Sequence, residues 1–103
     1  MKAFFDKINI EKDDDEEEYF LYQLKYNLIS DEEIKINIDS YDSLVREIIA
    51  TKGICLDILV HDDDWFVRRA VAEQGYRLDI LVVDDDEHVR HEAEYQLKIR
   101  GLL

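Results

Sequence analysis

Residues 56–75 read LDILVHDDDWFVRRAVAEQG, and residues 78–97 repeat this stretch 22 positions later as LDILVVDDDEHVRHEAEYQL. The same offset places a third Val-Arg pair, Val45-Arg46, before these two stretches. Self-similarity at a period of about 20 to 50 residues is typical of arrays of small stacked units. The sequence therefore predicts three units of 22 residues, spanning residues 39–103.

Each unit contains the signals of one short helix. Asp42, Asp64 and Asp86 stand three residues before the valine of each Val-Arg pair. An aspartate at the N-cap accepts hydrogen bonds from free amides of the first helical turn, and its charge complements the helix dipole. Gly53 and Gly75 then end the first two helices, because glycine readily takes the left-handed conformation at a helix C-terminus. We expect a capped helix of two to three turns in each unit.

Short apolar returns connect these helices. Residues 56–60 and 78–82 lie between a glycine stop and the next aspartate triplet, which leaves too little chain for a full helix. We predict one turn of 3-10 helix or an extended link there. A single unit cannot bury its apolar side alone, whereas stacked units bury a continuous core. The predicted fold class is all-α, a short right-handed α-solenoid.

These spacings resemble HEAT-type repeats in a very short form, closest to the leucine-rich repeat variant. In the HEAT pattern an aspartate and an arginine six residues later form a ladder between successive repeats. Asp62 with Arg68 and Asp84 with Arg90 match that spacing, whereas Ser40 stands where the first repeat would need the acid. The resemblance implies an alternation of α-helix and 3-10 helix over residues 39–100, with a weakened ladder at the first repeat. It implies little about activity.

The two ends of the array differ from its middle. Glu92 and Glu94 replace Ala70 and Ala72 of the preceding unit, and a polar outer face is typical of a terminal repeat. Without an internal glycine, the last helix should continue toward Gly101. We interpret the third unit as a C-terminal cap.

Residues 1–38 do not follow the period and are interpreted as an N-terminal helical cap. Six consecutive acids at residues 13–18 precede an aromatic-rich stretch, which predicts a helix over residues 14–29. Ser30 and Glu33 then suggest a capping box that opens a short helix through Ile38. Residues 2–10 form a short helix or a strand, and the pattern favours neither. Caps and repeats together make one structural domain.

Charge limits the possible partners. The 103-residue chain has 26 acidic and 13 basic residues and a net charge of -13, so nucleic acid and anionic membranes would repel it. No apolar run approaches the roughly 18 residues of a membrane helix, and no secretion signal is recognisable. Cys55 is the single cysteine, which suits a reducing compartment. We expect a soluble cytoplasmic protein.

Motifs for catalysis or cofactor binding are missing from the sequence. His88 and His91 share a helical face but lack a clear third metal ligand. The aspartate triplets lack the ligand series of a calcium-binding EF-hand. The variant repeat family resembles proteins with a cysteine-bound iron–sulfur cluster, which one cysteine cannot hold. We expect no enzymatic activity, no metal and no cofactor.

Two kinds of binding function stay open. In the first, the protein is a scaffold or adaptor that contacts a protein partner, with Trp65 as the candidate aromatic anchor. Trp65 could equally pack beneath the neighbouring repeat. In the second, it is an inhibitor like the phage-encoded anti-CRISPR proteins, whose carboxylates imitate nucleic acid in a basic groove. Three aspartates per unit and a helix spacing of 8 to 10 Å would give roughly one charge per 3 Å, close to the 3.4 Å of a DNA strand. The expected partner-binding residues are Asp13, Asp14, Asp15, Glu16, Glu17, Glu18, Asp63, Trp65 and Asp85.

Overall fold

The computed structural model describes residues 13–103, with side chains from Glu18 onward. This part of the chain is helical and contains no strand, as the sequence predicted. It falls into two compact units that divide between Ser30 and Asp31. The predicted helix or strand at residues 2–10 lies outside the described residues. In chain order the elements are α2 (Asp13–Lys25), α3 (Asp31–Ile36), η1 (Ile38–Ser40), α4 (Ser43–Thr51), α5 (Leu56–Leu59), α6 (Trp65–Glu73), α7 (Leu78–Leu81) and α8 (Glu87–Ile99).

Helix α2 of the first unit is shorter than predicted. It begins with the acidic run but ends at Lys25 instead of continuing to Ile29. Asn27 takes a left-handed conformation (φ 58°), and the Leu28 amide donates to the Gln23 carbonyl over 2.8 Å. This is a Schellman ending, which asparagine supports less often than glycine. The early stop had no glycine to mark it in the sequence.

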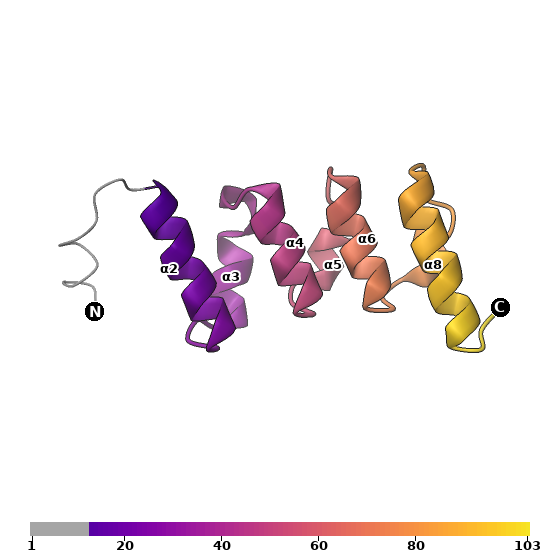
Figure 1. Ribbon diagram of the computed structural model, residues 1–103, viewed down its shortest axis with the longest axis horizontal. Coiled ribbons are helices and arrows are strands. Elements are labelled where there is room, and N and C mark those ends of the chain that lie inside the picture. Colours follow the sequence, from indigo (N-terminus) through magenta and orange to yellow (C-terminus); the bar gives the residue numbers. More distant parts are fainter. Residues whose placement is uncertain (1–12) are drawn as a thin grey trace. The chain divides into compact units, whose positions relative to one another are not determined.

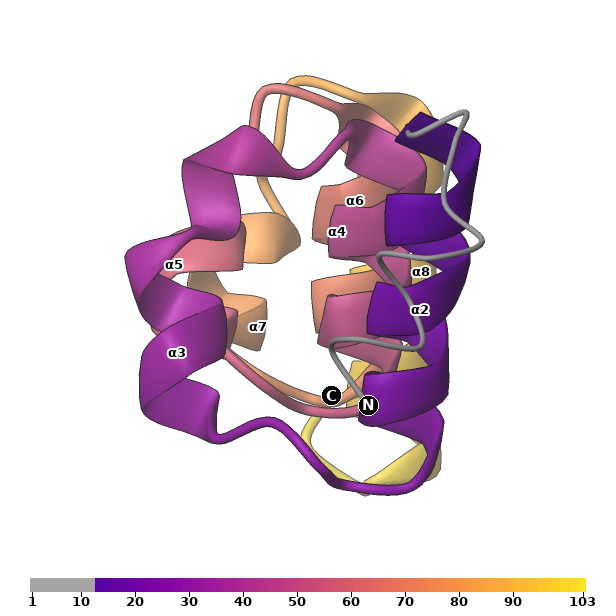
Figure 2. The same ribbon diagram turned by 90° about the vertical axis from the view of Figure 1, so that its left-hand side faces the viewer.

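The second unit has two layers of helices. Helices α4, α6 and α8 lie side by side in one layer, and the short elements α3, α5 and α7 lie in the other (Figures 1 and 2). Burial of branched apolar side chains between the layers drives this arrangement, because each short helix has only one apolar stripe. The fully buried side chains of these helices include Ile34, Ile49, Leu59, Val67, Val71, Leu81 and Val89.

Glycine ends the longer helices of the second unit. Gly53 (φ 77°) and Gly75 (φ 79°) follow α4 and α6, and the amide of each next residue donates back to the helix. These stops agree with the sequence prediction. Helix α8 has no internal glycine, and it extends through Ile99 to a third such ending at Gly101 (φ 72°).

Aspartate caps two of the three repeat helices. The Asp42 carboxylate accepts from the Leu44 amide over 3.0 Å, and Asp86 accepts from the His88 amide over 2.8 Å. Asp64 also stands at an N-cap position, but its side chain accepts no amide hydrogen bond. Its Oδ2 lies 3.3 Å from Arg46 Nη2 instead. The prediction of a side-chain cap at Asp64 is therefore wrong, because the Asp64 carboxylate forms an ion pair with Arg46.

The apolar returns are single α-helical turns, not the predicted 3-10 turns or extended links. Helices α5 and α7 each have four residues. Each begins after a left-handed residue, Cys55 (φ 57°) or Arg77 (φ 48°), which reverses the chain before the turn. The predicted helix through Ile38 is also shorter than expected, since α3 ends at Ile36. In the described repeats, a 3-10 helix is found at η1, directly after α3.

Candidate interaction surface

Arginine–aspartate pairs join successive repeats. Arg46 on α4 donates to both carboxylate oxygens of Asp62, with Nε–Oδ2 at 2.6 Å and Nη2–Oδ1 at 3.1 Å. Arg68 on α6 binds Asp84 in the same way, at 2.9 and 3.0 Å. The two aspartate side chains are only 6% and 8% exposed. Each arginine therefore contacts the acid of the repeat that follows it.

Because each arginine pairs with the following repeat, the serine at position 40 does not weaken the pair formed by Arg46. The sequence prediction of a weakened ladder at Arg46 is wrong, because Arg46 pairs forward with Asp62. Arg46 is the first arginine of the chain, so no earlier arginine needs a carboxylate at Ser40. At the other end, Arg90 donates to the Asp84 carbonyl over 2.8 Å, and the described residues give it no ion pair. Asp62, Arg68 and Asp84 do join repeats, but Asp62 pairs with Arg46 and Asp84 pairs with Arg68. Arg90, which the spacing matched with Asp84, reaches only its backbone carbonyl.

Hydrogen bonding shifts the pKa values of the paired side chains. The bond to Asp62 raises the pKa of the Arg46 guanidinium, and the bond to Asp84 does the same for Arg68. Burial alone would raise the pKa of Asp84, but the hydrogen bonds from Arg68 and from the Asp86 amide outweigh it, and the pKa lies below its usual value. The Asp84 carboxylate is therefore kept charged, and its contact with Arg68 leaves it unavailable to a partner.

The middle aspartate of each triplet points to solvent. Asp63 is exposed, and the side chain of Asp85 is 95% exposed, with one oxygen 3.4 Å from Arg68 Nη2. These two predicted partner-binding residues occupy the same position in consecutive repeats. Glu18 of the acidic run is also exposed, and it belongs to the first compact unit. The side chains of residues 13–17 lie outside the described part of the structure.

Trp65 packs against the next repeat. Its ring stacks on His88 of α8 at a centroid distance of 4.5 Å, and the Phe66 ring meets it edge-on at 5.8 Å. The Arg69 guanidinium lies 5.6 Å from the ring centroid. The side chain is half-buried, so only part of it is available to a partner. Its role as a binding anchor stays a prediction.

Cys55 and His88, the residues best suited to chemistry by type, have contacts or burial that favour a structural role. Burial raises the pKa of the Cys55 thiol above its usual value, which lowers the thiolate fraction that nucleophilic attack requires. His88 stacks on the tryptophan, and its Nδ1 lies 3.3 Å from Asp86 Oδ1. Among residues 13–103, no three His, Cys, Asp or Glu side chains are grouped as metal ligands. No helix in that range is long and apolar enough to cross a membrane.

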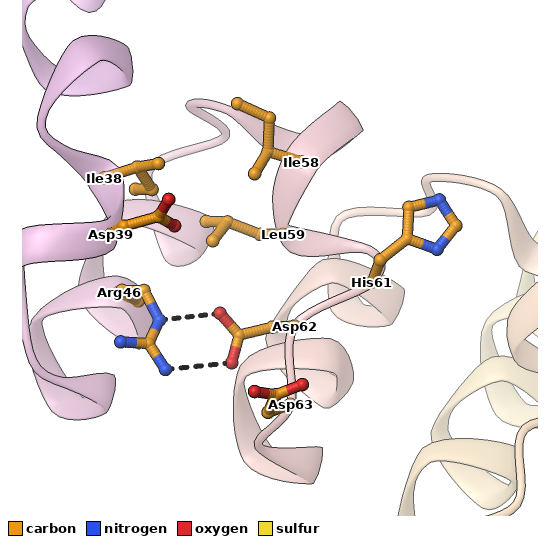
Figure 3. A pocket seen from close by; sticks show the side chains of 8 residues that line it. All are labelled: Ile38, Asp39, Arg46, Ile58, Leu59, His61, Asp62 and Asp63. Atoms are coloured by element: carbon orange, nitrogen blue, oxygen red, sulfur yellow. Dashed lines mark hydrogen bonds and ion pairs between the residues drawn. The ribbon is translucent and has the colours of Figure 1, made fainter.

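A cleft of about 310 Å³ opens between η1 and the loop that follows α5 (Figure 3). Sequence reasoning selected only Asp63 from its lining. The signal that could have revealed the rest is a break in the repeat: Asp39 aligns with His61 and then with Val83 at the 22-residue offset. The lining residues are Ile38, Asp39, Arg46, Ile58, Leu59, His61, Asp62 and Asp63.

Comparisons with known proteins give no further identification. No protein-family model matches the chain, and neither the curated proteins nor the solved structures contain a significant match.

Proposed function

We propose that this chain is a non-enzymatic HEAT-like repeat protein, a right-handed α-solenoid that serves as a scaffold or adaptor for a basic protein partner. One observation carries the proposal. The fold uses the first aspartate of each triplet in the ladder, whereas Asp63 and Asp85 face solvent at matching positions. An exposed carboxylate at the same position of two successive repeats complements a basic surface.

The net charge supports the same kind of partner. A charge of -13 repels nucleic acid and anionic lipid, and it speeds encounter with a basic protein. A cytoplasmic location would suit the single cysteine and is part of the proposal.

The nucleic-acid mimic is the second candidate, and the triplets support it less well than their sequence suggested. Only one aspartate per triplet is both exposed and outside the ladder and cap positions. With packed helices about 8 to 10 Å apart, the triplets alone would present one such charge per 8 to 10 Å, against 3.4 Å along a DNA strand. This mismatch favours an adaptor over an imitation of the phosphate backbone.

The acidic run offers the direct test of an electrostatic partner surface. Replacing residues 13–18 by the matching amides removes six carboxylates, of which helix α2 needs only a few at its N-terminus. We expect the melting temperature to stay the same or rise slightly, because adjacent like charges repel. Binding to a basic partner, first identified by cross-linking in a cell extract, should weaken about tenfold, or about 1.4 kcal/mol. Stopped-flow measurements should place this loss in the association rate and show it shrinking as salt rises.

A control with three carboxylates changed elsewhere tests whether the location of the charge matters. Asp31, Glu32 and Asp57 are exposed carboxylates of the second unit, and their conversion to amides should change the association rate by less than about twofold. A run variant that associates at the wild-type rate in low salt would contradict an electrostatic role for α2. Competition by duplex DNA for the same partner would instead favour the mimic.

A further inference from the structure

The cleft has a mostly polar surface, to which partly exposed Ile58 adds an apolar part. Ile38, Ile58 and Leu59 supply the apolar lining, and Arg46 with Asp62 forms a hydrogen-bonded pair at its edge (Figure 3). In this view Asp39 and Asp63 lie on opposite sides of that pair. A volume of about 310 Å³ is at the lower end of the range for ligand sites, enough for one long side chain.

The charge that remains available in the cleft is negative. Arg46 is neutralised by Asp62 and by the more distant Asp64, and its Nη1 donates to the Tyr41 carbonyl over 2.6 Å. Asp62 also accepts the Asp64 amide over 3.0 Å, so its oxygens are occupied. Asp39 and Asp63 are exposed, and within residues 13–103 neither carboxylate has an ion pair.

The next repeat lacks this combination. At the 22-residue offset, His61 replaces Asp39, and Val83 replaces His61. Asp85 takes the place of Asp63, but one of its oxygens lies 3.4 Å from Arg68. Among the described residues, the first junction thus has two exposed carboxylates without an ion pair, whereas the second has one carboxylate that already contacts a guanidinium.

We propose that the cleft between η1 and the α5–α6 loop binds a basic side chain, a lysine or arginine presented by the protein partner. This inference rests on the proposed adaptor function and assigns its contact point. The aliphatic stem would lie on Ile58, the partly exposed member of the apolar lining, because long basic side chains bury their methylene groups on apolar surface. The cationic head would bind Asp39 or Asp63, since charge-assisted hydrogen bonds are stronger than neutral ones.

The experiment is a heteronuclear NMR titration of the full chain with doubly capped lysine, N-acetyl-lysine methylamide. Capped norleucine, which keeps the stem and lacks the charge, is the control ligand. We expect saturable shifts at the amides of Asp39, Ile58 and Asp63, with binding about fivefold weaker for norleucine. Shifts that spread over all acidic residues without saturating would overturn the proposal. This test uses the wild-type chain alone.

Variants locate the carboxylates. Asp39→Asn with Asp63→Asn keeps the side-chain shapes at exposed positions and should reduce lysine binding about fivefold. Asp85→Asn, the matched change in the next repeat, should leave it unchanged. An equal loss from both variants would overturn the proposal. A basic partner that binds wild type and the double variant equally would also overturn it while leaving the adaptor function intact, whereas absence of any basic partner would count against that function itself.

Discussion

The two repeat junctions use the same residues but complete their contacts differently. At the first junction Arg46 binds Asp62 and extends to Asp64, the third aspartate of the triplet. At the second, Arg68 binds Asp84 and extends to the middle aspartate instead. The triplet sequence is identical in both. The role of each aspartate is therefore decided by where the guanidinium of the preceding repeat lies.

The consequence appears at the next helix. Because Asp64 contacts Arg46, it gives no side-chain cap to α6. Within residues 13–103 Asp86 forms no ion pair with an arginine, and it caps α8 through two amides. A carboxylate can thus serve the ladder or the cap, and the choice differs between adjacent repeats.

The largest expected effect comes from removing the ladder arginine of the second junction. Arg68→Ala should lower the free energy of unfolding by about 2 to 3 kcal/mol, because it leaves the buried Asp84 carboxylate without its partner. Arg69 is the matched control, since it is more exposed and its nearest acid is 3.9 Å away. Arg69→Ala should cost less than about 0.5 kcal/mol in urea unfolding. Equal costs for the two variants would disprove a stabilising ladder.

The cap comparison should give an intermediate effect. Asp86→Ala removes two amide hydrogen bonds and should cost about 1 kcal/mol in the free energy of unfolding. Asp64→Ala removes only a longer ion pair at a partly exposed side chain and should cost less than about 0.5 kcal/mol. Asp63→Ala should have almost no effect on stability. If thermal and urea unfolding show Asp64→Ala to be the costlier change, the described division between ladder and cap is wrong.

Acidification should weaken the ladder pair of the second junction without a mutation. The folded-state pKa of Asp84 lies below its usual value, so its ion pair stabilises the fold above the unfolded pKa, near pH 4. That contribution declines as the pH falls through the folded-state value. The stability gap between wild type and Arg68→Ala should therefore narrow below about pH 4 in urea titrations at several pH values. A gap that stays constant from neutral to strongly acidic pH would show that the charge of Asp84 is not involved.

Local sequence signals predicted much of this fold. Glycine at positions 53 and 75 ends helices because its backbone tolerates a left-handed conformation, and the aspartates stand where helices begin. These signals act within a few residues and can be read from the chain. Asn27, Cys55 and Arg77 also take left-handed conformations, but their residue types mark such positions weakly. The early end of α2 and the form of the returns followed from them.

The candidate site was less accessible to sequence reasoning. Asp39, Arg46 and Asp62 are separated along the chain, and only the folded repeat brings them to one cleft. The partner of each arginine is 16 residues ahead, whereas the familiar spacing suggested an acid six residues behind. At that nearer position the arginine meets the backbone carbonyl, as Arg68 does at Asp62. Which atom accepts the hydrogen bond depends on geometry that residue spacing does not contain.

The forward direction of the arginine pairs bears on how repeat number can change in such a chain. A duplicated segment of residues 62–83, inserted before Asp84, would carry its own aspartate to receive Arg68 and its own arginine to reach Asp84. Deletion of the same segment would let Arg46 meet Asp84 at the distance along the chain now held by Asp62. Gain or loss of whole periods therefore keeps the 16-residue separation of arginine and aspartate at each remaining junction, whereas an insertion of another length between the two residues changes it. The arginine–aspartate pairs therefore favour changes of chain length in steps of 22 residues.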